Sequence, residues 1–401
     1  MRVTTSSTYR NFTTSVNNVH FNLNKSMNKV STGEAYENAA ESPLNYYSGK
    51  KIDNQYQDTL NKISLIKSVQ NRIYQQELGA RDIQKILSGA KNQVQFARTG
   101  TTTDYALEST RDDLYQKQYE IIDALNMEYE GFFIYGGNDV SVTPFTLKYD
   151  RDDPTKPFTF TYSHTFPGES SATEFEFKLT YNAADGTSEF KLQNPTDTPL
   201  ASSNTANSTK TREDLLLQAM SEQGRVDIGY GSIQEKDTFG SRDTLLDTYT
   251  GGINLLTGIT SDAVKTQAIT LSDVEEALTN SSLGLIGRSI QTIAYNIDAG
   301  RTQQTQSTMH EALGDVITRM TESEHLTSTV YSDLGNKYRL LEDTKDKLDI
   351  EKISLMTQYK DKLGADPYES IIDMYNHQYS YNAALQVGSK LMSSSLFDFM
   401  A

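Results

Sequence analysis

The sequence has 401 residues, contains no cysteine and carries a formal net charge of −16 at pH 7. A chain of this length can bury the cores of two or three domains without help from metals or disulfides, and the lack of cysteine excludes thiol redox chemistry and thiolate metal sites. The acidic charge argues against nucleic acid as a partner, because binding phosphates requires a basic surface.

No stretch of the sequence approaches the ~18 apolar residues that a membrane span requires. Residues 1–31 also lack the basic, apolar and cleavage regions of a secretory signal. We therefore expect no membrane span, and by the ordinary export route the protein would stay in the cytoplasm. Hydrophobic residues make up only 36% of the chain, which is typical of long helices with one polar face.

The first predicted helix covers residues 8–31, and its apolar residues follow the alternating three- and four-residue steps of a coiled coil. One helix cannot bury such a stripe by itself, so we expect the last helix of the chain and neighbouring subunits to cover it. Ser31, Thr32 and Gly33 predict the end of this helix, because glycine accepts the left-handed conformation of a C-cap. The predicted interface residues are Phe12, Val16, Val19, Leu23, Met27 and Val30.

After a linker over residues 34–41, Ser42 and Pro43 offer an N-cap and a first-turn proline. They open a second helix that is predicted to run to about Arg98. A third helix is predicted over residues 104–130, so that the two form a helical hairpin.

An aromatic strand with a glycine-rich turn follows at residues 131–139 and contains Phe133, Tyr135, Gly136 and Gly137. One interpretation is an ordinary β-hairpin that caps the helices. The other is a motif specific to a protein family, considered below.

From residue 144 to about residue 260 the apolar pattern alternates with period two, which predicts a β-rich module. Phe158, Phe160 and Tyr162 share one strand face, Phe175 to Tyr181 form another, and Asp185-Gly186 supplies a turn before Phe190. A short helix near residues 214–223 and a strand at residues 226–230 are also predicted. Helical patterning resumes at Ser272, which has capping-box spacing to Glu275.

The longest pattern is a heptad from Leu313 to Leu355, which most simply predicts intrachain core, and Gly364 ends it. Asp366 and Pro367 then open the last helix. Its apolar stripe and the tail beyond it have no remaining partner except the first helix and other subunits. The predicted interface residues here are Ile371, Met374, Gln378, Tyr381, Leu385, Met392, Leu396, Phe397 and Phe399.

The sequence contains no convincing constellation of catalytic residues. The five histidines lack metal-ligand spacing, and the glycines around Gly284 and Gly287 do not follow a strand and lack a phosphate-loop lysine. We expect no catalytic, cofactor or metal site, and therefore not an enzyme.

The two ends together resemble the flagellin superfamily and, within it, the family of hook-filament junction proteins, the third hook-associated proteins. The resemblance covers about residues 1–145 and 272–401, and the middle matches no family in this way. It is carried by Met1-Arg2-Val3-Thr4, Ser31-Thr32-Gly33, Glu41-Ser42-Pro43, Phe133-Ile134-Tyr135-Gly136-Gly137, Thr143-Pro144-Phe145, Asp333-Leu334-Gly335, Arg339-Leu340-Leu341-Glu342, Ala365-Asp366, residues 378–385 and Ser395-Leu396-Phe397-Asp398-Phe399. The chain departs from the family pattern at Glu34, where a basic residue is common, and at Glu41-Ser42, where two acidic residues often precede the proline.

The resemblance implies a mainly α fold with an inserted β-rich module, in which a rod of long antiparallel helices pairs the N- and C-terminal segments. Residues 1–42 with 365–401 would form a coiled-coil assembly region that is disordered until assembled. Residues 43–143 with 263–364 would form the helical rod with its hairpin, and residues 144–262 the outer variable module.

The resemblance also implies a function and partners. The protein would be a structural adaptor of the bacterial flagellum, exported by the flagellar type III apparatus without a cleaved signal peptide and located outside the cell. It would associate with itself into a ring and contact flagellin, the first hook-associated protein and an export chaperone on its C-terminal helix. The alternatives are a flagellin-type filament subunit and, more distantly, a glycan-processing enzyme in the middle module.

Overall fold

The computed structural model describes residues 5–99, 103–140, 142–149, 158–169, 171–199, 209–222, 224–227, 245–248 and 250–400. At residues 5, 6, 8, 227, 245 and 391–400 it describes the backbone alone. The described residues form a mainly α fold with a β-rich module, as the sequence predicts. None of their helices is long and apolar enough to cross a membrane.

The chain divides into two compact units. Unit 1 contains Met1–Leu65 and Lys345–Ala401, and unit 2 contains Ile66–Thr344. The predicted three-part division places its boundaries elsewhere and stays a prediction.

Unit 1 contains the two terminal helices, α1 (Thr5–Thr32) and α10 (Pro367–Met400), together with the beginning of α2 (Pro43–Arg98) and the end of α9 (Gln303–Leu363). Gly33 ends α1 with a φ of 72°, the predicted left-handed cap. At the start of α10, the Asp366 side chain accepts hydrogen bonds from the backbone N–H groups of Tyr368 at 2.8 Å and Glu369 at 3.2 Å.

In unit 2 the remainder of α2 lies antiparallel to the remainder of α9. Lys91 of α2 pairs with Glu324 of α9, and the rings of Tyr74 and Tyr338 lie 5.8 Å apart. The predicted heptad of α9 is buried, which confirms that it is core of the chain. Its members are Leu313, Met320, Thr327, Leu334, Leu341, Leu348 and Leu355.

The third helix, α3 (Asp104–Leu125), ends earlier than predicted. The residues after it form a hairpin of β1 (Glu128–Tyr129) and β2 (Phe132–Phe133), whose turn at Glu130 and Gly131 has positive φ values of 55° and 81°. A turn of this kind cannot continue a helix. α3 packs along α8 (Ser282–Asp298), in which Leu283, Ile286, Ile290 and Ile293 are buried.

The β-rich module contains an antiparallel sheet in the order β3-β4-β5-β6. The strands are β3 (Phe145–Lys148), β4 (Phe158–His164), β5 (Thr173–Asn182) and β6 (Thr187–Leu192), and they bring the predicted aromatic faces together. A second pair consists of β7 (Arg225–Asp227) and β8 (Leu245–Asp247). The rest of the strand predicted at 226–230 lies outside the described residues.

Helices also occur inside this region. They are α4 (Arg212–Met220), α5 (Gly252–Thr257), α6 (Ser261–Thr266) and α7 (Leu271–Thr279). The capping box of α7 lies two residues before the predicted one, because Thr270 and Asp273 form it. Glu275, the predicted partner of Ser272, instead binds the backbone of β6.

Candidate assembly interface

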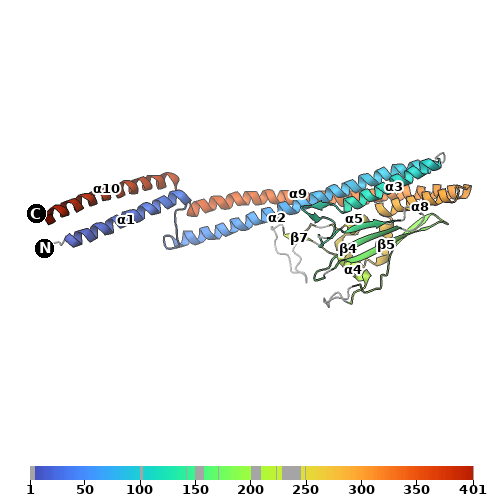
Figure 1. Cartoon of the computed structure of the whole chain (residues 1–401), viewed down its shortest axis with the longest axis horizontal. Helices are drawn as coiled ribbons and strands as arrows, with labels where there is room; N and C mark the ends of the chain where they lie inside the picture. Colours follow the sequence, from blue (N-terminus) through green and yellow to red (C-terminus); the bar gives the residue numbers. More distant parts are fainter. Residues whose placement is uncertain are drawn as a thin grey trace. The chain divides into compact units, whose positions relative to one another are not determined.

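The two terminal helices form an antiparallel pair within unit 1, as Figure 1 shows for α1 and α10. Phe12 of α1 faces Gly388 of α10 so closely that a Cβ at residue 388 would lie 2.5 Å from Phe12 Cζ. Further along, the ring centroids of His20 and Tyr381 are 5.3 Å apart. These two contacts define the register of the pair, in which later residues of α1 face earlier residues of α10.

The predicted stripe of α1 is only partly covered. Its first four members are half-buried, and the next position of the stripe is Ser26, which is 5% exposed. Met27 is 50% exposed and Val30 is 38% exposed. The half-buried members are Phe12, Val16, Val19 and Leu23.

On α10 the residues that share the coiled-coil spacing on the covered side are mostly small or polar. Those that are buried or half-buried at this spacing are Ser370, Met374, His377, Tyr381, Ala384 and Gly388. Of the predicted interface residues, Met374 and Tyr381 belong to this inner face. Ile371 and Leu385 are instead 39% and 47% exposed, and Gln378 is exposed as well. The side chains of Met392, Leu396, Phe397 and Phe399 lie outside the described residues.

Large apolar side chains therefore remain uncovered along both terminal helices. Contiguous exposed apolar surface on a helix is typical of a surface that another molecule covers. These outward residues lie away from the faces that α1 and α10 cover on each other. The exposed residues are Tyr9, Phe21, Met27, Val30, Tyr368, Ile371, Ile372, Tyr375, Tyr379, Leu385 and Val387.

Backbone hydrogen bonds join the two linkers between the terminal helices and the long helices. Ala35 N–H donates to the Leu363 carbonyl at 2.6 Å, and Ala365 N–H donates to the Gly33 carbonyl at 2.9 Å. Glu34 lies between these bonds and accepts a 2.6 Å hydrogen bond from the Tyr359 hydroxyl. Burial and the Glu34 carboxylate together raise the pKa of Tyr359 above its ordinary value.

Side chains of the first linker also bind α1. Lys25 pairs with Glu41 at 2.9 Å, and this hydrogen bond lowers the pKa of the Glu41 carboxyl. The Thr32 hydroxyl accepts from Glu34 N–H at 3.2 Å, while Ser31 is exposed and Pro43 begins α2. Both acidic departures from the family pattern, Glu34 and Glu41, thus have partners within unit 1.

The predicted hairpin motif lies in the interior of unit 2. Tyr135 is fully buried, its hydroxyl donates to the Gln76 carbonyl of α2, and burial raises its pKa. The Gln76 amide donates in return to the Ile134 carbonyl at 2.8 Å. Gly136 and Gly137 are buried and Phe133 is half-buried. The Ile134-Tyr135 part of the motif is therefore held against the middle of α2.

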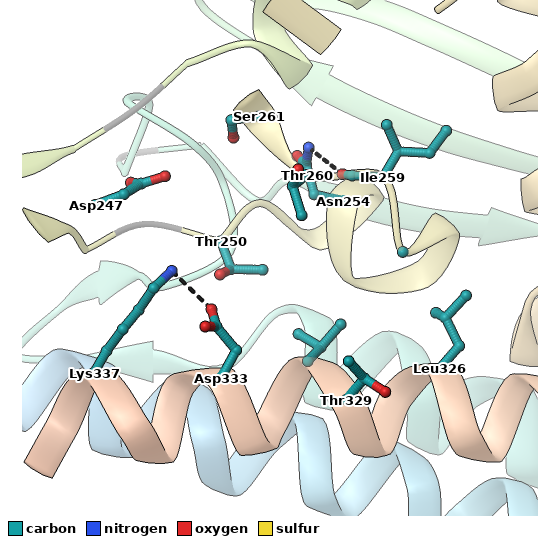
Figure 2. A pocket seen from close by; sticks show the side chains of 12 residues that line it. Asp247, Thr250, Asn254, Ile259, Thr260, Ser261, Leu326, Thr329, Asp333 and Lys337 are labelled. Carbon is teal, nitrogen blue, oxygen red and sulfur yellow. Dashed lines mark hydrogen bonds and ion pairs between the residues drawn. The ribbon is translucent and has the colours of Figure 1, made fainter. Parts of the chain in front are cut away.

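Unit 2 also has a cavity of about 490 Å³ between α9 and the loops around α5 and α6 (Figure 2). Lys337 and Asp333 of α9 form an ion pair of 2.9 Å at one end of it. Leu326 and Ile259 line the other end, where Asn254 donates to the Ile259 carbonyl at 2.8 Å. Among the residues that the structure describes, no group of three or more His, Cys, Asp or Glu side chains could hold a metal ion.

The sequence pattern missed the inner face of α10 because small residues give no hydrophobic signal. Ser370, Ala384 and Gly388 recur in register with Met374 and Tyr381 at coiled-coil spacing. This spacing is the feature of the sequence from which the inner face could have been predicted. Small residues let two helix backbones approach closely, which fits Phe12 against Gly388.

No protein-family model matches the sequence, and no curated protein matches it. Among solved structures, the chain is similar to a flagellar hook-associated protein of Vibrio parahaemolyticus, with 10% identity and a TM-score of 0.49 over 81% of this chain and 100% of that one. It is also similar to FlgL of Bacillus cereus, with 13% identity and a TM-score of 0.36 over 79% of this chain and 100% of that one. For FlgL of Xanthomonas campestris the values are 10% identity and a TM-score of 0.28 over 75% of this chain and 99% of that one.

Proposed function

We propose that this chain is a structural subunit of the bacterial flagellum that connects the preceding hook-associated protein to the flagellin filament. The observation that carries the proposal is the outward apolar face of the α1–α10 pair, of which Ile372 and Tyr375 are 59% and 62% exposed. Covering one such side chain fully contributes about 1.5–3 kcal/mol. A second copy of the chain can supply this cover in a ring.

The sequence motifs at both ends support the junction role. Gly33 and Pro43 bound the first linker, and the Phe133 to Gly137 motif and the tail around Phe397 are similar to those of junction proteins. In this proposal the ring contacts flagellin on one side and the first hook-associated protein on the other. Before assembly an export chaperone binds α10, and the chain leaves the cell through the flagellar type III apparatus without loss of a signal peptide.

The second candidate is a flagellin-type filament subunit, which would use the same apolar faces. A filament subunit polymerises by itself, whereas a junction adaptor stops at a ring and requires different partners above and below. Polymerisation of the purified chain into long filaments would favour this candidate.

The test is deletion of the gene in its host, followed by electron microscopy of the cell surface and a search of the medium for flagellin. Hooks without filaments, together with monomeric flagellin in the medium, support the adaptor. Restoration of filaments by the intact gene is the control. Normal filaments on the deleted strain would contradict the proposal.

A further inference from the structure

The last strand of the four-stranded sheet, β6, has one side without a neighbouring strand. Gln193 N–H donates to the Glu176 carbonyl of the β5 segment at 2.8 Å. Because backbone groups alternate along a strand, Phe190 and Leu192 point their N–H groups away from β5. An edge of this kind is a template on which a strand of another molecule can pair.

Helix α7 lies along this edge and accepts both hydrogen bonds. The Thr279 hydroxyl accepts from Phe190 N–H at 2.9 Å, and Glu275 Oε1 accepts from Leu192 N–H at 2.9 Å. Four residues of helix rise about 6 Å, and two residues of strand rise about 6.8 Å. The spacing of the two acceptors on α7 therefore matches the spacing of the two donors on β6.

The Glu275 side chain is held in place beside β6. It is 8% exposed, and its second carboxylate oxygen binds Lys191 Nζ at 2.9 Å. The carboxylate raises the pKa of Lys191, as expected for a close ion pair. Both oxygens of Glu275 are thus occupied by β6.

The opposite edge of the sheet is closed in a similar way. The side chain of Asn126, just after α3, donates to the Phe145 carbonyl at 2.7 Å and accepts from the Phe145 N–H at 3.0 Å. This pair of bonds reproduces the two bonds that a neighbouring strand would make with one residue. Side chains of α7 and of the residue that follows α3 therefore bind outward backbone groups of the two edge strands.

We propose that Glu275, Thr279 and Asn126 are edge guards, which occupy the backbone groups that a strand of a second copy would otherwise bind. The proposal rests on the proposed function, because a chain that packs against its own copies brings sheets together at high local concentration. The guards restrict contact between copies to the helical faces.

The experiment compares the full-length parent with Glu275→Met/Thr279→Val, which removes both acceptors while keeping similar side-chain volumes. Glu276→Met is the matched control, because Glu276 is an exposed carboxylate on the same helix that accepts from neither residue. Amide hydrogen exchange is followed at Phe190 and Leu192, and association is followed by sedimentation, at low and high protein concentration. If the double variant does not fold, Thr279→Val alone is compared with Thr279→Ser.

At low concentration, exchange at the two amides should rise about tenfold in the double variant, since one hydrogen bond at each is lost. At high concentration the variant should associate beyond the parent, and both amides should regain protection as β6 pairs with a second copy. Unchanged exchange would overturn the proposal. Faster exchange without added association would also overturn it, because the side chains would then only stabilise the strand. These readouts need no flagellum, so their failure leaves the gene-deletion test of the junction role independent.

Discussion

At the scale of single residues, two glycines of α2 differ sharply in what surrounds them. A Cβ on Gly79 would lie 2.7 Å from the Tyr135 hydroxyl oxygen, whereas a Cβ on Gly89 would meet only Lys117 Cε at 3.9 Å. Glycine costs helix stability relative to alanine. Its presence at residue 79 is therefore explained by the buried tyrosine rather than by the helix.

We expect Gly79→Ala to lower the free energy of unfolding by about 1–3 kcal/mol, because the added methyl group displaces the Tyr135 ring from its site. Gly89→Ala should instead raise it by about 0.5–1 kcal/mol. Urea unfolding of both variants measures the difference. Equal effects at the two positions would show that the ring does not constrain residue 79.

A second residue-scale prediction concerns alkaline pH. The pKa of Tyr359 is raised in the folded protein from its ordinary value of 10.0. Its contribution to stability is therefore complete below pH 10 and is lost as the pH rises toward the folded-state pKa. We expect Tyr359→Phe to flatten the fall in unfolding free energy above about pH 10.

Chemical unfolding of parent and variant between neutral and strongly alkaline pH checks this. Tyr375→Phe, which changes an exposed tyrosine of α10, is the control. A variant as sensitive to alkali as the parent would mean that the Glu34 contact does not hold the hydroxyl proton.

At the scale of elements, two adjacent residues of α10 lie on different faces of the helix, one toward α1 and one outward. Ala384 is half-buried on the side of α1, and its neighbour Leu385 is 47% exposed. Successive residues of a helix are turned by about 100° around its axis. Substitutions at these two adjacent positions therefore test the contact with α1 and the outward face separately.

Ala384→Asp should loosen the α1–α10 pair of the isolated chain by about 1–3 kcal/mol, because it introduces a polar group into the partly covered seam. Leu385→Asp should leave the helix content of the isolated chain unchanged and block incorporation at the junction. Circular dichroism and complementation of the deleted strain measure the two effects. Incorporation of Leu385→Asp at the parent level would contradict the outward interface.

At the scale of the whole molecule, α8 of unit 2 and α1 of unit 1 differ in how many of their residues are buried. In α8 nearly every residue is buried, whereas α1 has only Ser26 buried among its described side chains. Local opening requires least free energy where few apolar contacts hold an element. Amide exchange in the isolated chain should therefore be faster in α1 and α10 than in α8, and should slow in both terminal helices on assembly. Equal protection before and after assembly would argue against an assembly role for these helices.

The sequence predicted the long elements well, because caps and heptads are local signals: Pro43, Gly33 and Asp366 mark real helix boundaries. It did not predict α5 and α6, whose few residues are too short for periodicity. It also placed Ile371 and Leu385 on the seam of the terminal pair, whereas Ser370 and Ala384 lie there. The exposure of Ile371 and Leu385 shows that the largest apolar residues of a helix do not always mark its buried face.

The small inner face of α10 also has a thermodynamic consequence. Ser370, Ala384 and Gly388 lie on the side of α10 that faces α1, so most of the large apolar side chains of α10 face outward. In the proposed assembly, the free energy of the contacts that these outward side chains make would depend on subunit concentration. In the proposed ring, free chains should then add only above a threshold concentration, and preferentially beside copies that are already in place. The identity of the surface that receives the first chain would thereby decide where assembly begins.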